Sequence, residues 1–252
     1  MIRALTLDPA ALAPRFAAAA PFPHVVLDGF LEERAAHEVA AAFPVEPDAT
    51  WTARHHLHSR KWTLSDIDRL PWPVVHAFAA LHRSDWIDWL ERLTGIRPLH
   101  ADPDLYGGGM HVSTPGSFLD VHADFTQHPV MKERRALNIL LYLSPDWEPA
   151  WGGHLELWGH DMRRCVRSIA PRFNRAVIFA TSATSFHGHP TPMAGAPTAR
   201  RCSLAGYYYT PWRPGEPVSV ATTDYRPRPQ DWEKRARKLA RRVLRAVGMS
   251  RR

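Results

Sequence analysis

The sequence predicts an α+β domain in which helices cover one side of a β-sheet. The chain has 252 residues, of which 45% are hydrophobic, and this is enough for one domain with a full core. Helical patterns concentrate before residue 100, whereas most strand-like runs follow it. Helices first and many strands later are typical of a fold in which helices buttress a sheet.

The first third of the chain supplies the helices. Residues 1–20 predict a short helical or loose lead-in, and residues 23–31 predict a strand followed by the start of a helix. Residues 32–43 have helical composition and end at Pro44. One or two helices are predicted over residues 71–93, where apolar side chains recur at helical spacing: Val74, Val75, Phe78, Leu81, Trp86, Trp89, Leu90 and Leu93.

The rest of the chain predicts buried strands. Residues 136–143 and 175–180 are apolar runs of strand length, and residues 201–209 form a third run that is rich in aromatic residues. A short extended piece is predicted to begin at His187. These strands would provide the walls of a pocket.

A metal site is predicted from the tripeptide His122-Ala123-Asp124 and a distant histidine. In an extended strand, residues i and i+2 point to the same side, so His122 and Asp124 could bind one ion. Two imidazoles and one carboxylate are the ligand set of mononuclear non-haem iron. The third ligand would be His187, with His189 as the alternative on the same strand face.

The tripeptide alone is weak evidence, because the chain has 15 histidines and loop histidines are often simply solvated. The same pattern occurs at His100-Ala101-Asp102. Only Asp124 leads, after a polar loop, into a strand-length apolar run; Asp102 is followed by Pro103 and a glycine turn. The context therefore favours the copy at His122.

A candidate anion-binding residue lies on the last predicted strand. Arg201, Ser203 and Ala205 would share one face of that strand. A buried guanidinium needs an anion, and its planar geometry suits a carboxylate. The partner would be either a ligand or one of the protein's own acidic residues.

The chain resembles the prolyl-4-hydroxylase-like branch of the 2-oxoglutarate and Fe(II)-dependent dioxygenases. The resemblance extends over residues 20–212, and its motifs occur in the family's order, at residues 116–125, 137–147, 151–158, 170–190 and 201–210. It implies a double-stranded β-helix core, which is a jelly-roll or cupin-like fold, buttressed by the N-terminal helices. The metal would lie near one open end of this core.

The resemblance also implies site residues. His122, Asp124 and His187 would bind iron, and Arg201 would bind the distal carboxylate of 2-oxoglutarate with help from the Tyr142 hydroxyl. Asn138 shares a strand face with Tyr142 and could line the pocket, or it could be a core amide bonded to the backbone. His111 and His154 are further candidates for contacts near the site.

The implied reaction consumes 2-oxoglutarate and O₂, releases succinate and CO₂, and hydroxylates an unactivated C–H bond. The substrate would be a prolyl or peptidyl residue, a free amino acid or a small metabolite, and ascorbate could stimulate turnover. Asp124 disfavours halogenation, because related halogenases have a small residue there. The alternatives are a catalytically silent metal-binding or sensing protein, and a scaffold that acts through the C-terminal segment.

The positive charge is concentrated at the C-terminus. We expect residues 1–225 to form the dioxygenase domain, with its core motifs in residues 100–212, and residues 226–252 to form a basic helical segment. The whole chain and residues 231–252 both carry a net charge of +7, so the body is balanced. This segment would pack on the body, or contact anionic membrane or nucleic acid, although no nucleic-acid motif accompanies it.

Cellular location is inferred from the cysteines and the N-terminus. Cys165 and Cys202 lie in predicted strands and are expected to be reduced and buried. Charged residues and prolines interrupt any signal-peptide core, and no apolar run is long enough to span a membrane. These features predict a cytoplasmic protein, while the oligomeric state is left open.

Overall fold

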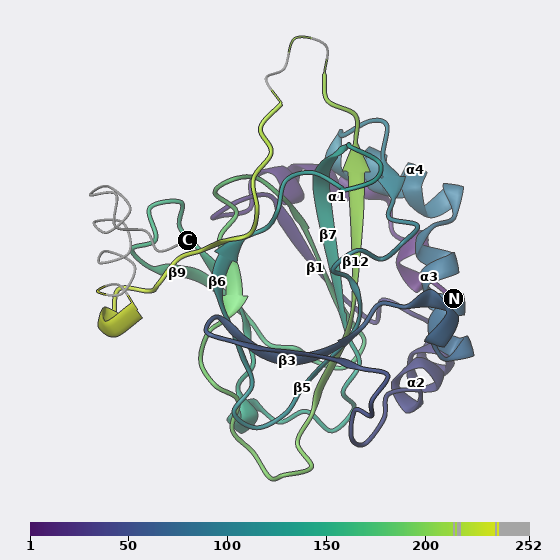
Figure 1. Cartoon of the computed structure of the whole chain (residues 1–252). Coiled ribbons are helices and arrows are strands. Elements are labelled where there is room, and N and C mark those ends of the chain that lie inside the picture. Colours follow the sequence, from purple (N-terminus) through teal and green to yellow (C-terminus); the bar gives the residue numbers. More distant parts are fainter. Residues whose placement is uncertain (214, 216–217, 235, 237–252) are drawn as a thin grey trace.

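The computed structural model describes residues 1–213, 215, 218–234 and 236 (Figure 1). Four α-helices precede most of the sheet: α1 (Pro9–Ala17), α2 (Glu33–Ala41), α3 (Trp72–Leu81) and α4 (Ser84–Thr94). The strands of the described part are β1 (His24–Asp28), β2 (Thr52–His56), β3 (Ser59–Leu64), β4 (His100–Ala101), β5 (Gly109–Ser113), β6 (Phe118–Ala123), β7 (Arg134–Tyr142), β8 (Leu155–Trp158), β9 (Cys165–Ile169), β10 (Arg175–Ala180), β11 (His187–His189), β12 (Arg201–Thr210) and β13 (Asp224–Tyr225).

The strands from β5 to β12 form a jelly roll. One half pairs in the order β5-β12-β7-β10, and the other half pairs in the order β6-β11-β8-β9. Strand β3 joins the halves because it pairs with both β5 and β6, and β1 extends the first half beyond β10. The pairings are antiparallel, as expected for this architecture. The predicted double-stranded β-helix is thereby confirmed.

Alternation along β12 separates the helix-packed core from the interior of the jelly roll. Cys202, Leu204 and Tyr208 belong to the large hydrophobic core that also contains the buried residues of the helices. Arg201, Ser203 and Tyr207 point to the other side and line an interior cavity. The helices gather on one side of the sheet, next to β12 (Figure 1), so that they buttress the strand that carries Arg201.

Helix α4 shows how this buttress is built. The predicted region over residues 71–93 forms two helices, and α4 ends where Gly95 adopts a left-handed φ of 72°. Its buried side chains include Trp86, which stacks on Trp89 and donates a hydrogen bond of 2.8 Å to the Tyr208 hydroxyl. Burying a large apolar side chain stabilises the folded protein by about 1.5–3 kcal/mol. The hydrogen bond from Trp86 to Tyr208 also joins the helix to β12.

The β2–β3 hairpin was not predicted. It covers Thr52–His56 and Ser59–Leu64, and all five residues of β2 are exposed. Strand β13 is a second addition beyond the predicted core motifs, and it pairs with β6 at His122 and Ala123. The site described below therefore draws on segments on both sides of residues 100–212.

Most of the predicted basic C-terminal segment lies outside the described residues. At its start, the Lys234 ammonium pairs with the Asp120 carboxylate at 2.6 Å. Among the described helices, none has the length and hydrophobicity that crossing a bilayer requires. Both cysteines are free, and Cys202 is buried as expected, whereas Cys165 is only partly buried because it lies at the start of β9.

Candidate functional site

Two histidines and one carboxylate meet at the junction of β6 and β11. His187 lies directly opposite His122 in the antiparallel register of these strands, and their ring centroids are 4.6 Å apart. Asp124 follows the last residue of β6 rather than lying within it. The donor atoms of the three side chains all lie within 4.8 Å of one another.

Backbone carbonyls fix the orientation of both imidazoles. Nδ1 of His122 lies 2.8 Å from the Asp120 carbonyl oxygen, and Nδ1 of His187 lies 2.9 Å from that of Ser185. Each Nδ1 therefore carries the proton, and each Nε2 keeps a free lone pair. The Nε2 atoms face Asp124, at 3.5 Å from its Oδ1 and Oδ2 respectively. This donor set fits a divalent metal, since neutral imidazoles and an ionised carboxylate converge on one point.

A buried cation and an amide support Asp124. The Asn138 amide donates a 2.8 Å hydrogen bond to Oδ2 of Asp124, and Nε of Arg135 donates one of the same length to Oδ1 of Asn138. Nη2 of Arg135 lies 3.2 Å from Oδ2 of Asp124, and its guanidinium stacks 3.5 Å from the Tyr207 ring centroid. Asn138 is therefore bonded to a side chain, not to the backbone.

These contacts set the protonation states. Burial alone would raise the pKa of Asp124, but the charge of Arg135 and the two imidazoles hold it well below its usual value. Burial lowers the pKa of His187 to about 4, although Asp124 opposes this effect. At neutral pH, Asp124 is ionised and His187 is neutral, and these are the forms that bind metals.

Arg201 is buried at the opposite end of the strand face that carries Tyr207. Its Nε donates to the Gly153 carbonyl oxygen at 2.8 Å, and its Nη2 lies 3.2 Å from the Tyr142 hydroxyl. No carboxylate pairs with Arg201 in the part of the chain that the structure describes. Arg201 lines the cavity, whereas Tyr142 does not, so Tyr142 contacts the guanidinium from behind.

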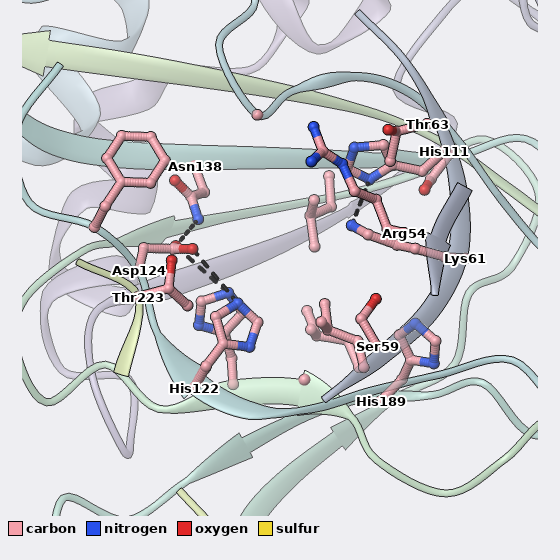
Figure 2. Close-up of a pocket in the computed structure, with 18 of the residues that line it drawn as sticks. Arg54, Ser59, Lys61, Thr63, His111, His122, Asp124, Asn138, His189 and Thr223 are labelled. Carbon is pink, nitrogen blue, oxygen red and sulfur yellow. Dashed lines mark hydrogen bonds and ion pairs between the residues drawn. The ribbon is translucent and has the colours of Figure 1, made fainter. Parts of the chain in front are cut away.

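A cavity of about 250 Å³ joins these groups. Figure 2 shows Asp124, Asn138 and His122 on one side, and residues of β3 with His111 and His189 on the other. His189 therefore lines the cavity but lies apart from the group formed by His122, Asp124 and His187. His111 also lines the cavity, whereas His154 does not. Sequence reasoning missed Arg135 and the β3 residues.

The second tripeptide, His100-Ala101-Asp102, does not assemble in the same way. His100 pairs with Glu133 at 2.8 Å, and Asp102 pairs with His128 at 3.2 Å. Asp102, Asp104 and His128 are close enough to hold an ion. However, Nδ1 of His128 accepts two backbone N–H bonds, so its Nε2 carries the proton and donates to Asp102. A protonated nitrogen cannot bind a metal, so we interpret this cluster as a structural pair.

The comparison with known protein families agrees with this geometry. Residues 108–209 match the model of the 2OG-Fe(II) oxygenase superfamily. The matched span runs from β5 to β12 and includes His122, Asp124, His187 and Arg201. The chain therefore contains a 2OG-Fe(II) oxygenase domain at residues 108–209. The family implies Fe(II), 2-oxoglutarate and O₂ as the metal and the substrates of this oxygenase.

Prolyl hydroxylases are among the proteins to which the oxygenase is similar. It is 29% identical over 143 residues to the prolyl 3-hydroxylase OGFOD1 of Mus musculus, a match that covers 55% of this chain but only 24% of that relative. A prolyl-4-hydroxylase from Pseudomonas putida has a similar fold, with a TM-score of 0.59 and 17% identity, over 80% of this chain and 98% of the other. A prolyl hydroxylase from Trichoplax adhaerens, solved with a peptide of hypoxia inducible factor, has a TM-score of 0.54 and 16% identity, over 79% of this chain and 88% of the other.

Proposed function

We propose that this oxygenase is a hydroxylase in which His122, Asp124 and His187 hold the iron. The convergence of two Nε2 lone pairs and an ionised carboxylate at the β6–β11 junction carries the proposal. Bound Fe(II) would supply O₂ activation, coupled to the conversion of 2-oxoglutarate into succinate and CO₂. The protein's own part is to orient the three ligands, and the backbone carbonyls and Asn138 do this.

Arg201 is proposed to bind the distal carboxylate of 2-oxoglutarate. Its guanidinium has five N–H groups, and the contacts with Gly153 and Tyr142 occupy only two of its nitrogens. The remaining N–H groups can therefore donate to a carboxylate in the cavity. Tyr142 acts on the cosubstrate through Arg201, by fixing the position of the guanidinium. Asn138 likewise acts through Asp124, as a positioning residue.

The proposed substrate is a prolyl residue in a peptide, a free amino acid or a small metabolite, hydroxylated at an unactivated C–H bond. The similarity to prolyl hydroxylases supports a substrate with a prolyl ring or a related one. Leu119, Leu140 and Leu155 line the cavity and provide apolar surface for such a group. A reducing compartment such as the cytoplasm would suit Fe(II), and the two free cysteines are consistent with it.

Succinate formation tests the proposal. The purified protein, supplied with Fe(II), 2-oxoglutarate and O₂, should release succinate when a substrate from a panel of prolyl peptides, amino acids and metabolites is added. His122→Ala should abolish this release, and Arg201→Ala should raise the KM for 2-oxoglutarate by about 10- to 100-fold, because a buried charge-assisted contact is lost. Arg60→Ala, at an exposed residue of β3, should change neither. Succinate release that survives His122→Ala would contradict the proposal, and metal binding without release for any substrate would favour a silent metal-binding protein.

A further inference from the structure

Two cations face each other across the β2–β3 hairpin. Arg54 and Lys61 are direct partners in the antiparallel register, and both line the cavity. Like charges directly opposite on paired strands destabilise a sheet. Neither side chain forms an ion pair within the described residues. An anion bound between Arg54 and Lys61 would relieve this repulsion.

No acidic side chain forms an ion pair with Lys61 among the described residues. Its ammonium contacts Nδ1 of His111 at 3.4 Å, and this is a neutral partner. Burial and the positive charge of Arg201 together lower the pKa of Lys61 to about 8, although the charge of Asp124 across the cavity opposes this effect. Because Nδ1 of His111 accepts from Lys61, the proton of the neutral His111 ring is on Nε2. That N–H is a second donor on this side of the cavity.

Unpartnered polar atoms surround the same pair. Oγ of Ser59, Nε2 of His111 and Nδ1 of His189 make no hydrogen bond, although these residues are only 1%, 7% and 4% exposed. All three line the cavity beside Lys61, opposite Asp124 (Figure 2). Buried polar atoms without partners are rare and costly in proteins. Their presence beside two cations that form no ion pair among the described residues indicates that a polar ligand completes this side.

The charges distinguish this ligand from the cosubstrate. Under the proposed function, one carboxylate of 2-oxoglutarate is at the metal and the other is at Arg201, so none remains for Arg54 and Lys61. Arg54 lines the cavity and is also exposed, so it can be reached from solvent. We propose that Arg54 and Lys61, with His111, form a subsite for a carboxylate of the substrate. The inference rests on the proposed function and narrows its substrate to small carboxylic acids such as free amino acids, in preference to internal prolyl residues.

Paired probes test the subsite without turnover. Protein loaded with Ni(II) and saturated with 2-oxoglutarate is titrated calorimetrically with each free L-amino acid and with its primary amide. We expect at least one acid to bind, about tenfold or more tighter than its amide, because a charge-assisted contact is worth about 1.5–3 kcal/mol. Arg54→Gln and Lys61→Met should both remove this preference. Arg60→Gln, next to Lys61 but on the exposed face of the same strand, should keep it.

Three results would overturn the subsite. These are binding of no acid, an acid-to-amide preference that survives both Arg54→Gln and Lys61→Met, and an effect of these variants confined to the affinity for 2-oxoglutarate. The last result would assign the pair to the cosubstrate. The titration of 2-oxoglutarate into the Ni(II)-loaded wild-type protein is a separate arm. If 2-oxoglutarate does not bind to the Ni(II)-loaded protein, the proposed function itself is contradicted. If 2-oxoglutarate binds but the acids show no preference over their amides, only the subsite is contradicted.

Discussion

The two sides of the cavity differ in how completely their polar groups are satisfied. On the metal side, Asp124 receives a hydrogen bond from Asn138 and the charge of Arg135, and both ligand histidines are held by backbone carbonyls. On the hairpin side, Arg54 and Lys61 face each other, and neither forms an ion pair among the described residues. The metal side is therefore organised before any ligand arrives, whereas the hairpin side is left for a ligand to complete.

The largest expected effect separates two histidines of one short strand. His187→Ala should weaken Fe(II) or Ni(II) binding by more than about 100-fold. Even the loss of a residue that only hydrogen-bonds a metal ligand lowers metal affinity by about 10- to 100-fold. His189→Ala should leave metal affinity almost unchanged, because His189 lies on the hairpin side. Anaerobic metal titration measures both. An equal loss of metal affinity in the two variants would contradict the assignment of His187 to the metal side and of His189 to the hairpin side.

Acid should destabilise the metal-free protein through the metal side. His187 has a pKa near 4 in the folded protein and an ordinary value of 6.5. Between these values the unfolded chain binds a proton that the folded chain does not, so the free energy of unfolding falls as the pH falls through this window. His187 accounts for about 3 kcal/mol of this loss. Urea unfolding at several pH values should show a smaller pH dependence in His187→Gln; an unchanged dependence would contradict the assignment.

Removing the support of Asp124 should weaken metal binding less than removing a ligand. Asn138→Ala should cost about tenfold in metal affinity and Arg135→Met up to about 100-fold. Loss of the Arg135 charge also raises the pKa of Asp124, so the deficit of Arg135→Met should grow between pH 7.5 and pH 5. Metal titrations at the two pH values check this. A deficit that is the same at both would mean that Arg135 does not act through the carboxylate.

The smallest expected effect is a gain in stability on the hairpin side. Lys61→Met should stabilise the ligand-free protein by about 1 kcal/mol at pH 7, a figure reduced to allow for partial exposure. The pKa of Lys61 is lowered to about 8, so below this pH the half-buried ammonium destabilises the folded state. The gain should vanish as the pH rises toward the ordinary pKa of 10.5. Arg60→Met is the control, and a destabilised Lys61→Met would show that the cation is compensated.

The same division explains what the sequence could predict. The strands at residues 136–143, 175–180 and 201–209 were predicted correctly, because buried strands leave long apolar runs. His122, Asp124 and a distal histidine could be named from spacing and motif order. The choice between His187 and His189 depends on a register shift between these two residues, which no sequence pattern reports.

The sequence contains no comparable pattern that predicts the hairpin side of the cavity. Strand β2 is exposed along its whole length, so it lacks the apolar alternation that identifies a strand. Arg135 is the second residue of β7, and a charged residue so near the start of a strand suggests contact with solvent rather than with the buried carboxylate of Asp124. Both features depend on which strands become neighbours. They could be found only from the fold.

The location of a bound metal tests the central claim most directly. Crystals soaked in Mn(II) should show an anomalous peak about 2.0–2.3 Å from Nε2 of His122, Nε2 of His187 and one carboxylate oxygen of Asp124. No comparable peak is expected at Asp102 and His128, whose hydrogen bonds leave no free nitrogen. A peak at that second cluster, or none at the junction of β6 and β11, would contradict the account.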